Sequence, residues 1–443
     1  MRISIVGTGY VGLVTGACFA ERGLQITCVD IDPERVAALN RAESPIFEEG
    51  LDELLRRNVG RSLCATTNLT EAVLDSEVTF IAVGTPFNGE EIDLTAVLRA
   101  ARQIGAAIAQ KSTYHVVVVK STVVPGTTDR CVLPALEEAS GKRAGTDFGV
   151  AMNPEFLSEG EAVHDFMFPD RLVLGGIDER SIQVLDRLYA SYPDDVPRLR
   201  TNTRTAEMIK YASNSLLATL ISFSNEVANL GAAIGGVDAV DVLRGVHLSQ
   251  YFRSRNAEGL PPITSFLAAG CGFGGSCLPK DVSALIAQGR QVGSPMPLLQ
   301  SVIQVNHEQP HRTVGLLKKR WPSLDGIRVA VLGLAFKPGT SDVRESPAFP
   351  IIRELLEEGA LVGAYDPVAT HEARKVLPEP RVRYHESLDA ALADVDAVVV
   401  VTPWKEFADI PARLNGRQQA VTLVDARRAF EKDSMPLYEG IGL

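Results

Sequence analysis

Arg2-Ile-Ser-Ile-Val6-Gly7-Thr-Gly9-Tyr-Val-Gly12, followed by a helical stretch to about Arg22 and by Ile26-Thr-Cys-Val-Asp30, decides the fold of the first part of the chain. A short apolar strand runs directly into Gly-x-Gly-x-x-Gly, the glycines open a helix, and the next strand ends in an acid. This order is typical of the βαβ unit of a parallel, doubly wound sheet.

The same order returns far downstream. Arg328-Val-Ala-Val-Leu332 precedes a glycine-containing loop, a helical stretch to about Glu358, and Leu361-Val-Gly-Ala-Tyr-Asp366. Two further apolar runs, at 75–86 and 396–403, both end in Thr-Pro. Continuous apolar runs suit parallel strands that are buried on both faces. The sequence therefore predicts an α/β protein with two Rossmann-like doubly wound parallel-sheet domains.

A long central helix and a helical region join these two domains. Residues 198–260 contain no proline, and 203–234 are rich in helix-forming residues. Apolar residues recur there at helical spacing, at Met208, Ala212, Leu216, Leu220 and Phe223, before Gly235-Gly236 ends the pattern. A helix of about 45 Å bridges two domains or packs against a partner subunit, or else is an internal core helix. The predicted domains are 1–200, 201–305 and 306–443.

Composition narrows the function classes. The net charge of −11 over 443 residues gives no basic footprint for nucleic acid, although local cations can still hold an anionic ligand. The six cysteines are dispersed without a Cys-x-x-Cys pair, which indicates neither a disulfide framework nor a metal site. No signal sequence or membrane-spanning run is evident. We expect a cytoplasmic protein.

The first glycine turn has the context of a dinucleotide site. Its glycines allow close approach of a pyrophosphate, and the helix N-terminus supplies N–H donors. Asp30 can accept hydrogen bonds from ribose hydroxyls and would repel a 2′-phosphate, which favours NAD over NADP, although Arg35 would soften this preference. A nucleotide-free domain that keeps the turn is the alternative. The second copy reads Gly333-Leu-Ala-Phe-Lys337 instead, and a lysine there suits the phosphate of a different ligand.

Gly272-Phe-Gly-Gly-Ser-Cys277-Leu-Pro-Lys280-Asp281 predicts covalent chemistry. An ammonium near a cysteine favours the nucleophilic thiolate, although a buried structural cysteine is the alternative. A cysteine nucleophile together with a hydride acceptor suggests oxidation of an alcohol through an aldehyde to an acid. The aldehyde would be held as a thiohemiacetal, oxidised to a thioester and hydrolysed.

Such chemistry needs a base, oxyanion donors and activated water. Lys210 and Asn214 lie four apart on the predicted long helix and can together hold an oxyanion, or they can be a solvated lysine with a local polar partner. Glu155 and Glu159 are also four apart, a spacing that surface carboxylates often show. Thr122 ends an apolar strand, where a parallel sheet faces its ligand crevice.

These motifs jointly resemble the UDP-glucose/GDP-mannose dehydrogenase family over essentially the whole chain. The resemblance is carried by segments 7–12, 83–86, 121–122, 153–157, 207–214, 272–277 and 333–338. It implies oxidation of a nucleotide-sugar C6 alcohol to a uronate with two NAD per turnover. It also implies a homodimer formed through the central helix.

The resemblance implies a role for each matching residue. Cys277 would be the nucleophile, and Lys210 and Asn214 would hold the oxyanion. Asp281 would be the base through a water that Thr122 also orders, and Glu155 would assist hydrolysis. The NAD site would comprise Gly7, Gly9, Tyr10, Val11, Gly12, Asp30, Arg35, Thr85, Thr122, Glu159 and Arg344. The substrate site would comprise Glu155, Phe156, Leu157, Lys210, Asn214, Phe266, Gly270, Gly274, Phe336, Lys337 and Arg427.

One departure leaves the substrate open. Many UDP-glucose enzymes carry Arg-Ile-Gly ahead of the Phe-Leu loop, where this chain has Pro261-Pro262, and Arg253 or Arg255 would supply an arginine from another angle. UDP-glucose is the predicted substrate, with dTDP-glucose, GDP-mannose and UDP-N-acetylhexosamines as alternatives. A two-electron 3-hydroxyacid-type dehydrogenase is the alternative enzyme class, and a nucleotide-sugar sensor without turnover is the non-enzymatic one.

Overall fold

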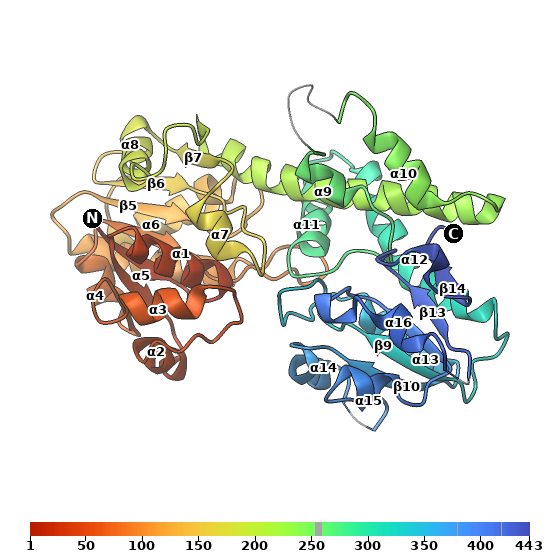
Figure 1. The fold of residues 1–443 in the computed structure, drawn as a ribbon. Coiled ribbons are helices and arrows are strands. Elements are labelled where there is room, and N and C mark those ends of the chain that lie inside the picture. The colour runs from red at the N-terminus through yellow and green to blue at the C-terminus, as the bar shows by residue number, and fades with distance from the viewer. Residues whose placement is uncertain (253–258, 379, 418) are drawn as a thin grey trace. The chain divides into compact units, whose positions relative to one another are not determined.

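The computed structural model describes residues 1–252, 259–378, 380–417 and 419–443. Within it the chain forms two compact units, Met1–Ser213 and Asn214–Leu443. Figure 1 colours the first unit from red to yellow-green and the second from green to blue. Arg253 and Arg255, offered as substitutes for the missing Arg-Ile-Gly arginine, lie outside the described residues.

The first unit is built on an eight-stranded sheet with the order β3-β2-β1-β4-β5-β6-β7-β8. Its strands are β1 (Arg2–Val6), β2 (Gln25–Val29), β3 (Leu63–Thr66), β4 (Val78–Ile81), β5 (His115–Val119), β6 (Phe148–Met152), β7 (Leu172–Gly176) and β8 (Arg198–Thr201). All neighbours are parallel except β6 and β7, which are antiparallel. The first six strands have the order of a dinucleotide-binding sheet, and the antiparallel step is a departure from the predicted all-parallel sheet.

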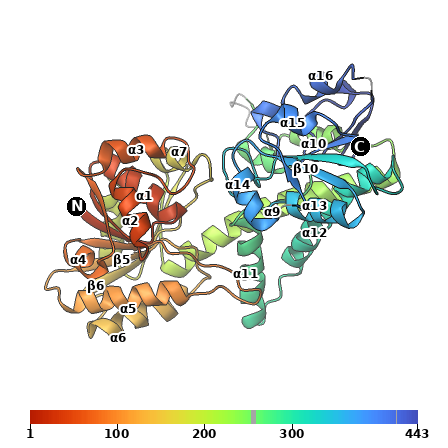
Figure 2. The ribbon, with the colours of Figure 1, turned by 90° about the horizontal axis from the view of Figure 1, so that it is seen from below.

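Helices cover both faces of this sheet. One face is packed by α1 (Tyr10–Glu21), α2 (Pro33–Asn40), α3 (Leu51–Asn58), α7 (Ala162–Met167) and α8 (Glu179–Leu188). The other is packed by α4 (Leu69–Leu74), α5 (Thr95–Ala109), the π-helix η1 (Thr128–Val132) and α6 (Leu133–Ser140). Figure 2 shows α5 and α6 side by side. Two separate apolar cores therefore hold the sheet between two helical layers, as a doubly wound fold requires.

The second unit repeats this plan around a six-stranded parallel sheet, with the order β11-β10-β9-β12-β13-β14. The strands are β9 (Arg328–Leu332), β10 (Leu361–Tyr365), β11 (Arg383–Tyr384), β12 (Ala397–Val400), β13 (Thr422–Asp425) and β14 (Tyr438–Gly440). One face packs against α10 (Ala239–His247), α12 (Pro297–Lys318), α13 (Ala348–Glu357) and α14 (Thr370–Val376). The other packs against α15 (Leu388–Leu392), η3 (Lys405–Phe407) and α16 (Ile410–Leu414). The prediction of two doubly wound domains is confirmed.

Short and long helical elements complete the chain. The predicted central helix is α9 (Thr203–Ile234), and Gly235 and Gly236, both with positive φ, end it as expected. The remaining elements are η2 (Pro262–Phe266), α11 (Leu278–Gln291) and η4 (Lys432–Ser434). Pro262 stands in the first turn of η2, where its missing N–H costs nothing. The Pro261-Pro262 segment therefore begins a short helix.

An aspartate follows the second strand in each of the two glycine-turn repeats, Asp30 in the first and Asp366 in the second, and the two lie in different surroundings. Asp366, after β10, is 3% exposed. One of its oxygens accepts hydrogen bonds from the N–H groups of Leu334 and Ala335 and from the indole of Trp404, at 2.7–3.0 Å. The other accepts from Val368 and Ala369. This carboxylate is committed to holding the second glycine turn in place.

Replacing Asp366 by alanine should strongly destabilise the second unit. Five donors would lose a charged acceptor in the interior, which costs about 3 kcal/mol or more. Both tryptophans, Trp321 and Trp404, belong to this unit, so a urea transition followed by tryptophan fluorescence reports on it.

Asp389→Ala, which removes an 84% exposed carboxylate, is the matched control and should change the free energy of unfolding by less than about 1 kcal/mol. Equal transition midpoints for the two variants would contradict the structural role of Asp366.

Candidate active site

The glycines of the first turn have two different roles. Gly7 and Gly12 allow close packing of the backbone, whereas Gly9 faces open space. Gly7 has φ +99°, and a Cβ on Gly12 would lie 1.9 Å from the carbonyl oxygen of Gly7. Helix α1 can therefore approach β1 closely only without side chains at these positions. A Cβ on Gly9, by contrast, would meet nothing within 4 Å, and φ there is an ordinary −68°. The protein itself does not need glycine at Gly9, so the open space suits a ligand that approaches the backbone.

Asp30 lies beside this turn, at the end of β2. Its Oδ2 accepts hydrogen bonds from the Thr8 N–H (2.9 Å) and the Thr8 hydroxyl (2.5 Å), and Oδ1 accepts one from Asp32. Burial raises the pKa of Asp30, but these hydrogen bonds and the charge of Arg35 outweigh it and hold the pKa below its usual range. The Arg35 guanidinium is 3.9 Å from Oδ2. Asp30 is thus an ionised acceptor with lone pairs left for ribose hydroxyls.

Tyr10, Thr85 and Glu159 lie in segments that are joined to the turn. The Tyr10 hydroxyl donates to the buried carboxylate of Glu48, which also accepts from Gly160 at 2.7 Å. This ties the loop that contains Glu159 to the first turn of α1. Thr85 donates its hydroxyl to the Thr122 carbonyl at 2.8 Å, which joins the ends of β4 and β5. The carboxyl ends of the strands are therefore held together where a ligand crevice is expected.

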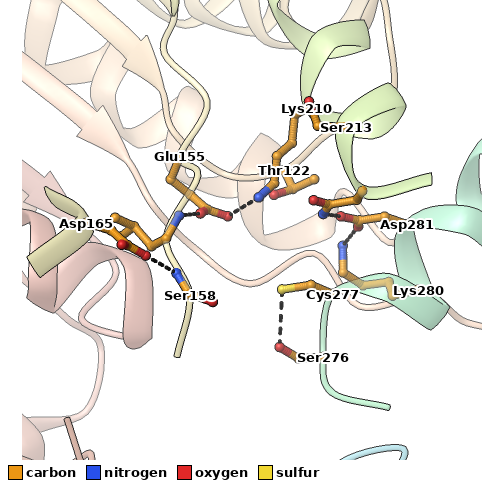
Figure 3. A network of polar contacts seen from close by, with 12 residues as sticks. Thr122, Glu155, Ser158, Asp165, Lys210, Ser213, Ser276, Cys277, Lys280 and Asp281 are labelled. Carbon is orange, nitrogen blue, oxygen red and sulfur yellow. Dashed lines mark hydrogen bonds and ion pairs between the residues drawn. The ribbon is translucent and has the colours of Figure 1, made fainter. Parts of the chain in front are cut away.

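A buried ion pair lies in the same unit. Lys210, in the second turn of α9, approaches Glu155 with Nζ 2.9 Å from Oε1, and both side chains are about 5% exposed or less. Glu155 Oε2 also accepts from the Leu157 N–H at 2.7 Å. Figure 3 shows the contact between Lys210 and Glu155. Burial raises the pKa of Glu155, but the ammonium of Lys210 outweighs it, so the pKa lies below its usual range. Of the four-apart glutamates, Glu155 is not the surface carboxylate that its sequence pattern also allowed.

A second buried lysine, which the sequence analysis did not select, lies nearby. Lys120 follows β5 directly and donates to Asn153 Oδ1 at 2.8 Å, an oxygen that also accepts from the Tyr189 hydroxyl at 2.5 Å. Burial lowers the pKa of Lys120 to about 7, although the charge of Glu155 opposes this. The lysine at the end of an apolar run, just before Ser121-Thr122, was the signal available in the sequence.

Cys277 belongs to the second unit, where it is the N-terminal flanking residue of α11. Its sulfur is 3.6 Å from the Ser276 hydroxyl, as the lower part of Figure 3 shows. The exposed N–H groups at a helix N-terminus stabilise an anion, including a thiolate. The side chain is half-buried, and this separates it from Cys271, which is fully buried and whose thiol pKa is raised by burial. Cys277 thus has the accessibility that a nucleophile needs.

Asp281, one turn into α11, is 1% exposed and has two partners. Asn214 donates to Oδ2 at 2.6 Å. Lys280 donates to Oδ1 at 2.5 Å, a contact that Figure 3 shows. The predicted base and one of the predicted oxyanion donors are therefore in direct contact. Lys210, 3% exposed, is not the solvated lysine that the four-apart pair also allowed, and Asn214 is bonded to Asp281 rather than serving as its local polar partner.

The glycine loop before Cys277 is anchored by two asparagines that the sequence analysis missed. Asn225 of α9 accepts from the Gly270 N–H at 2.7 Å, and Asn306 of α12 bonds both backbone groups of Phe273. Both asparagines are buried. A polar residue inside an apolar helix pattern was the only sign of them, and their partners are too distant along the chain to infer.

Several predicted substrate residues surround this loop. A Cβ on Gly274 would lie 2.1 Å from the Glu345 carbonyl oxygen, and one on Gly275 would meet the Phe336 ring at 2.7 Å. Gly275 also donates to the carbonyl of Arg344 at 2.9 Å. Arg427 lies against Gly270, with Nε donating to the Val401 carbonyl at 3.0 Å. The structure thus brings Phe336, Arg344 and Arg427 to the Cys277 loop, and Lys337 follows Phe336 directly.

Three family models together match most of this chain. They are described as the NAD binding domain, the central domain and the UDP binding domain of the UDP-glucose/GDP-mannose dehydrogenase family, and they match residues 1–193, 204–308 and 330–432. A UDP-glucose 6-dehydrogenase of Haloferax volcanii is 44% identical to the chain, with 100% of both sequences covered. The chain belongs to the UDP-glucose/GDP-mannose dehydrogenase family.

Other members of this family match the chain over nearly its whole length. The structure of a UDP-glucose dehydrogenase from Pyrobaculum islandicum superposes with a TM-score of 0.90 at 40% identity, covering 100% of this chain and 97% of that one. A GDP-mannose 6-dehydrogenase of Pseudomonas aeruginosa is 38% identical, with 96% of each sequence covered. The resemblance read from the motifs is confirmed.

The family assignment also confirms the cofactor prediction, since the model matching the first unit is that of an NAD-binding domain. The open space at Gly9 and the ionised Asp30 are what such a cofactor requires. No group of three or more His, Cys, Asp or Glu side chains with a metal-binding arrangement occurs among the described residues. Within the same residues, no helix combines the length and the apolar character needed to cross a membrane.

Alanine substitutions at two glycines of the cofactor turn should have different effects, one on the stability of the protein and the other on its affinity for NAD. Gly12→Ala should destabilise the first unit, because its Cβ would collide with the Gly7 backbone. Gly9→Ala should keep the wild-type thermal unfolding midpoint but weaken NAD binding by at least about tenfold, since only a ligand needs that space. Circular dichroism melting and calorimetric titration with NAD measure the two effects. Unchanged NAD affinity in Gly9→Ala would contradict the assignment.

Proposed function

We propose that this protein oxidises the C6 alcohol of UDP-glucose to the carboxylate of UDP-glucuronate, with reduction of two NAD. The observation that carries the proposal is the accessible thiol of Cys277 at a helix N-terminus, in a chain that also has the dinucleotide turn around Gly9 and Asp30. A dehydrogenase that stops at an aldehyde needs no cysteine. A cysteine allows the aldehyde to be held and oxidised again.

The proposed reaction balances in three steps. The alcohol loses its hydroxyl proton and a hydride from C6, which gives an aldehyde and the first NADH. The Cys277 sulfur adds to the aldehyde carbon, and loss of a second hydride converts this thiohemiacetal to a thioester and gives the second NADH. Water then displaces the thiol, which releases the carboxylate. NAD, when bound, supplies only the hydride-accepting ring.

The buried polar groups suit the remaining tasks. We assign proton abstraction to Asp281 through a water that Thr122 also orders. We assign stabilisation of the developing oxyanion to Lys210 and Asn214, because pre-placed N–H donors in a dry site need little reorganisation. Glu155, held ionised by Lys210, is assigned to thioester hydrolysis. Glu159 and Arg344 are assigned to NAD, and Phe266, Lys337 and Arg427 to the nucleotide sugar.

We propose UDP-glucose rather than another nucleotide sugar as the substrate for two reasons. Five curated UDP-glucose 6-dehydrogenases are 38–44% identical to the chain, whereas three GDP-mannose 6-dehydrogenases are 36–38% identical. The motifs around Phe266, Trp404 and Arg427 also resemble the UDP-glucose branch. The proposed division of labour is a cofactor domain at 1–200, a catalytic and dimerising domain at 201–305 and a nucleotide-sugar domain at 306–443.

Stoichiometry and the Cys277→Ser variant test the reaction together. With limiting UDP-glucose, the wild-type protein should form two NADH per substrate by absorbance, and it should prefer UDP-glucose over dTDP-glucose, GDP-mannose and UDP-N-acetylhexosamines. Cys277→Ser should lower uronate formation by at least about a hundredfold while NAD still binds. Cys64→Ser, at an exposed thiol, is the control and should behave as wild type.

Formation of only one NADH per substrate, together with a carbonyl product, would instead establish a two-electron dehydrogenase. Near-normal uronate formation by Cys277→Ser would refute the covalent step alone. Nucleotide-sugar binding without any NADH would favour the sensor.

We further propose a homodimer formed through α9 in a reducing, cytoplasmic setting. Along this helix Leu216, Phe223, Leu230 and Ile234 lie on one face and are between 49% and 67% exposed. Apolar side chains at intervals of seven, seven and four residues form a continuous stripe that a second copy of the same helix can cover. All six cysteines are free thiols, which suits the compartment.

Leu230→Glu should shift the protein from dimer to monomer, because it places a charge within that apolar stripe. The molar mass from light scattering after gel filtration measures this. Leu361→Glu is the matched control, since Leu361 is 60% exposed on β10 and Leu230 is 62% exposed. A dimer that persists in Leu230→Glu, or a monomeric wild type, would contradict the proposed interface.

A further inference from the structure

The first two turns of α9 hold the segment that follows Thr122. Glu207 is fully buried, and its carboxylate accepts two backbone hydrogen bonds, from Gly126 at 2.5 Å and from Thr128 at 2.8 Å. These N–H groups lie at the start of η1, where backbone donors have no partner one turn earlier. A side chain from 79 or more residues away in sequence supplies the missing acceptor.

Two more residues of α9 contact the same turn. The Thr203 hydroxyl donates to Asp129, and the Arg204 guanidinium donates to the other oxygen of Asp129 at 2.8 Å. Gly126 has φ +97°, which lets the chain turn toward Glu207. Residues 126–129 are therefore clamped from three positions on α9.

A buried glutamate is an energetically expensive way to cap a helix. A local serine, threonine or asparagine can satisfy such N–H groups without burying a charge. Burial instead raises the pKa of Glu207 to about 7, although the hydrogen bonds from Thr128 and Gly126 lower it. What a buried carboxylate adds is stronger, directional bonding between two elements that are distant in sequence.

Glu207 stands one turn before Lys210 on α9, and Gly126 stands four residues after Thr122. We propose that Glu207 is a positioning residue that fixes Thr122 with respect to the Lys210–Glu155 pair. Thr122 is held on its other side by Thr85, whose hydroxyl donates to the Thr122 carbonyl. Catalytic groups lose much of their effect when they shift by about 1 Å, so the clamp acts on turnover rather than on ligand affinity. This role rests on the proposed dehydrogenase function.

Glu207→Gln tests the inference. The amide keeps one acceptor oxygen but turns an NH₂ donor toward the other backbone N–H. We expect kcat for UDP-glucose oxidation to fall by about tenfold or more, with the KM values for NAD and UDP-glucose within about twofold of wild type. Glu137→Gln is the matched control, because Glu137 of α6 also accepts from a backbone N–H, that of Ala144 at 3.0 Å. It should leave kcat unchanged.

Thr203→Val provides a second variant should Glu207→Gln fail to fold, which melting curves would show. It removes only the hydroxyl bond to Asp129 and should lower kcat by about threefold at unchanged KM. Thr205→Val, at an exposed neighbouring position, is its control.

Wild-type kcat in both folded Glu207→Gln and Thr203→Val would overturn the positioning role while leaving the dehydrogenase intact. Raised KM with unchanged kcat would overturn it too, because the clamp would then serve ligand binding. A wild-type protein that reduces no NAD with any nucleotide sugar would refute the proposed function and this role with it.

Discussion

The need to give each buried charge a partner organises the candidate site. Glu155, Lys210, Lys120, Glu207 and Asp281 all lie in the interior, where an unpaired ion is far less stable than in water. Glu155, Lys210 and Asp281 are held by an opposite charge, Glu207 by two backbone N–H groups, and Lys120 by the amide oxygen of Asn153. These contacts leave the side chains few alternative positions. The same constraint that makes the site costly to fold also makes it rigid.

The two glycine turns show how one βαβ plan serves two purposes. In both, an acid at the end of the second strand accepts hydrogen bonds from the turn. Asp30 is bonded to Thr8 and keeps acceptor capacity for a ribose. Asp366 receives five donors and is buried, so none of its capacity remains for a ligand. The second unit keeps the architecture of a dinucleotide domain and has given up its mode of ribose recognition.

Local signals in the sequence were sufficient for much of the fold. Apolar runs predicted β1, β2, β4 and β5 of the first sheet and β9, β10 and β12 of the second. The absence of proline with a final Gly-Gly predicted α9 from Thr203 to Ile234. The antiparallel pairing of β6 with β7 was not predicted, since strand direction depends on how the chain returns to the sheet. For the site, the motifs selected Cys277 and Lys210 as candidates; the structure places Cys277 at the N-terminus of α11 and Lys210 in a buried ion pair, and their roles stay predictions. Lys120, Glu207, Asn225 and Asn306 were missed because their partners lie far away in sequence. A polar residue within an apolar pattern marks some of these positions, but it does not reveal the partner.

The protonation of Lys120 and Glu207 should contribute to binding enthalpies measured by calorimetry. Both have pKa values of about 7, one lowered and one raised by burial. Near neutral pH each is only partly protonated, so an event that changes its surroundings makes the protein take up or release a fraction of a proton. An anionic ligand bound close to Lys120 would draw protons from solution. The heat of such binding would then include the ionisation heat of the buffer, and the enthalpy measured in phosphate would differ from that measured in Tris.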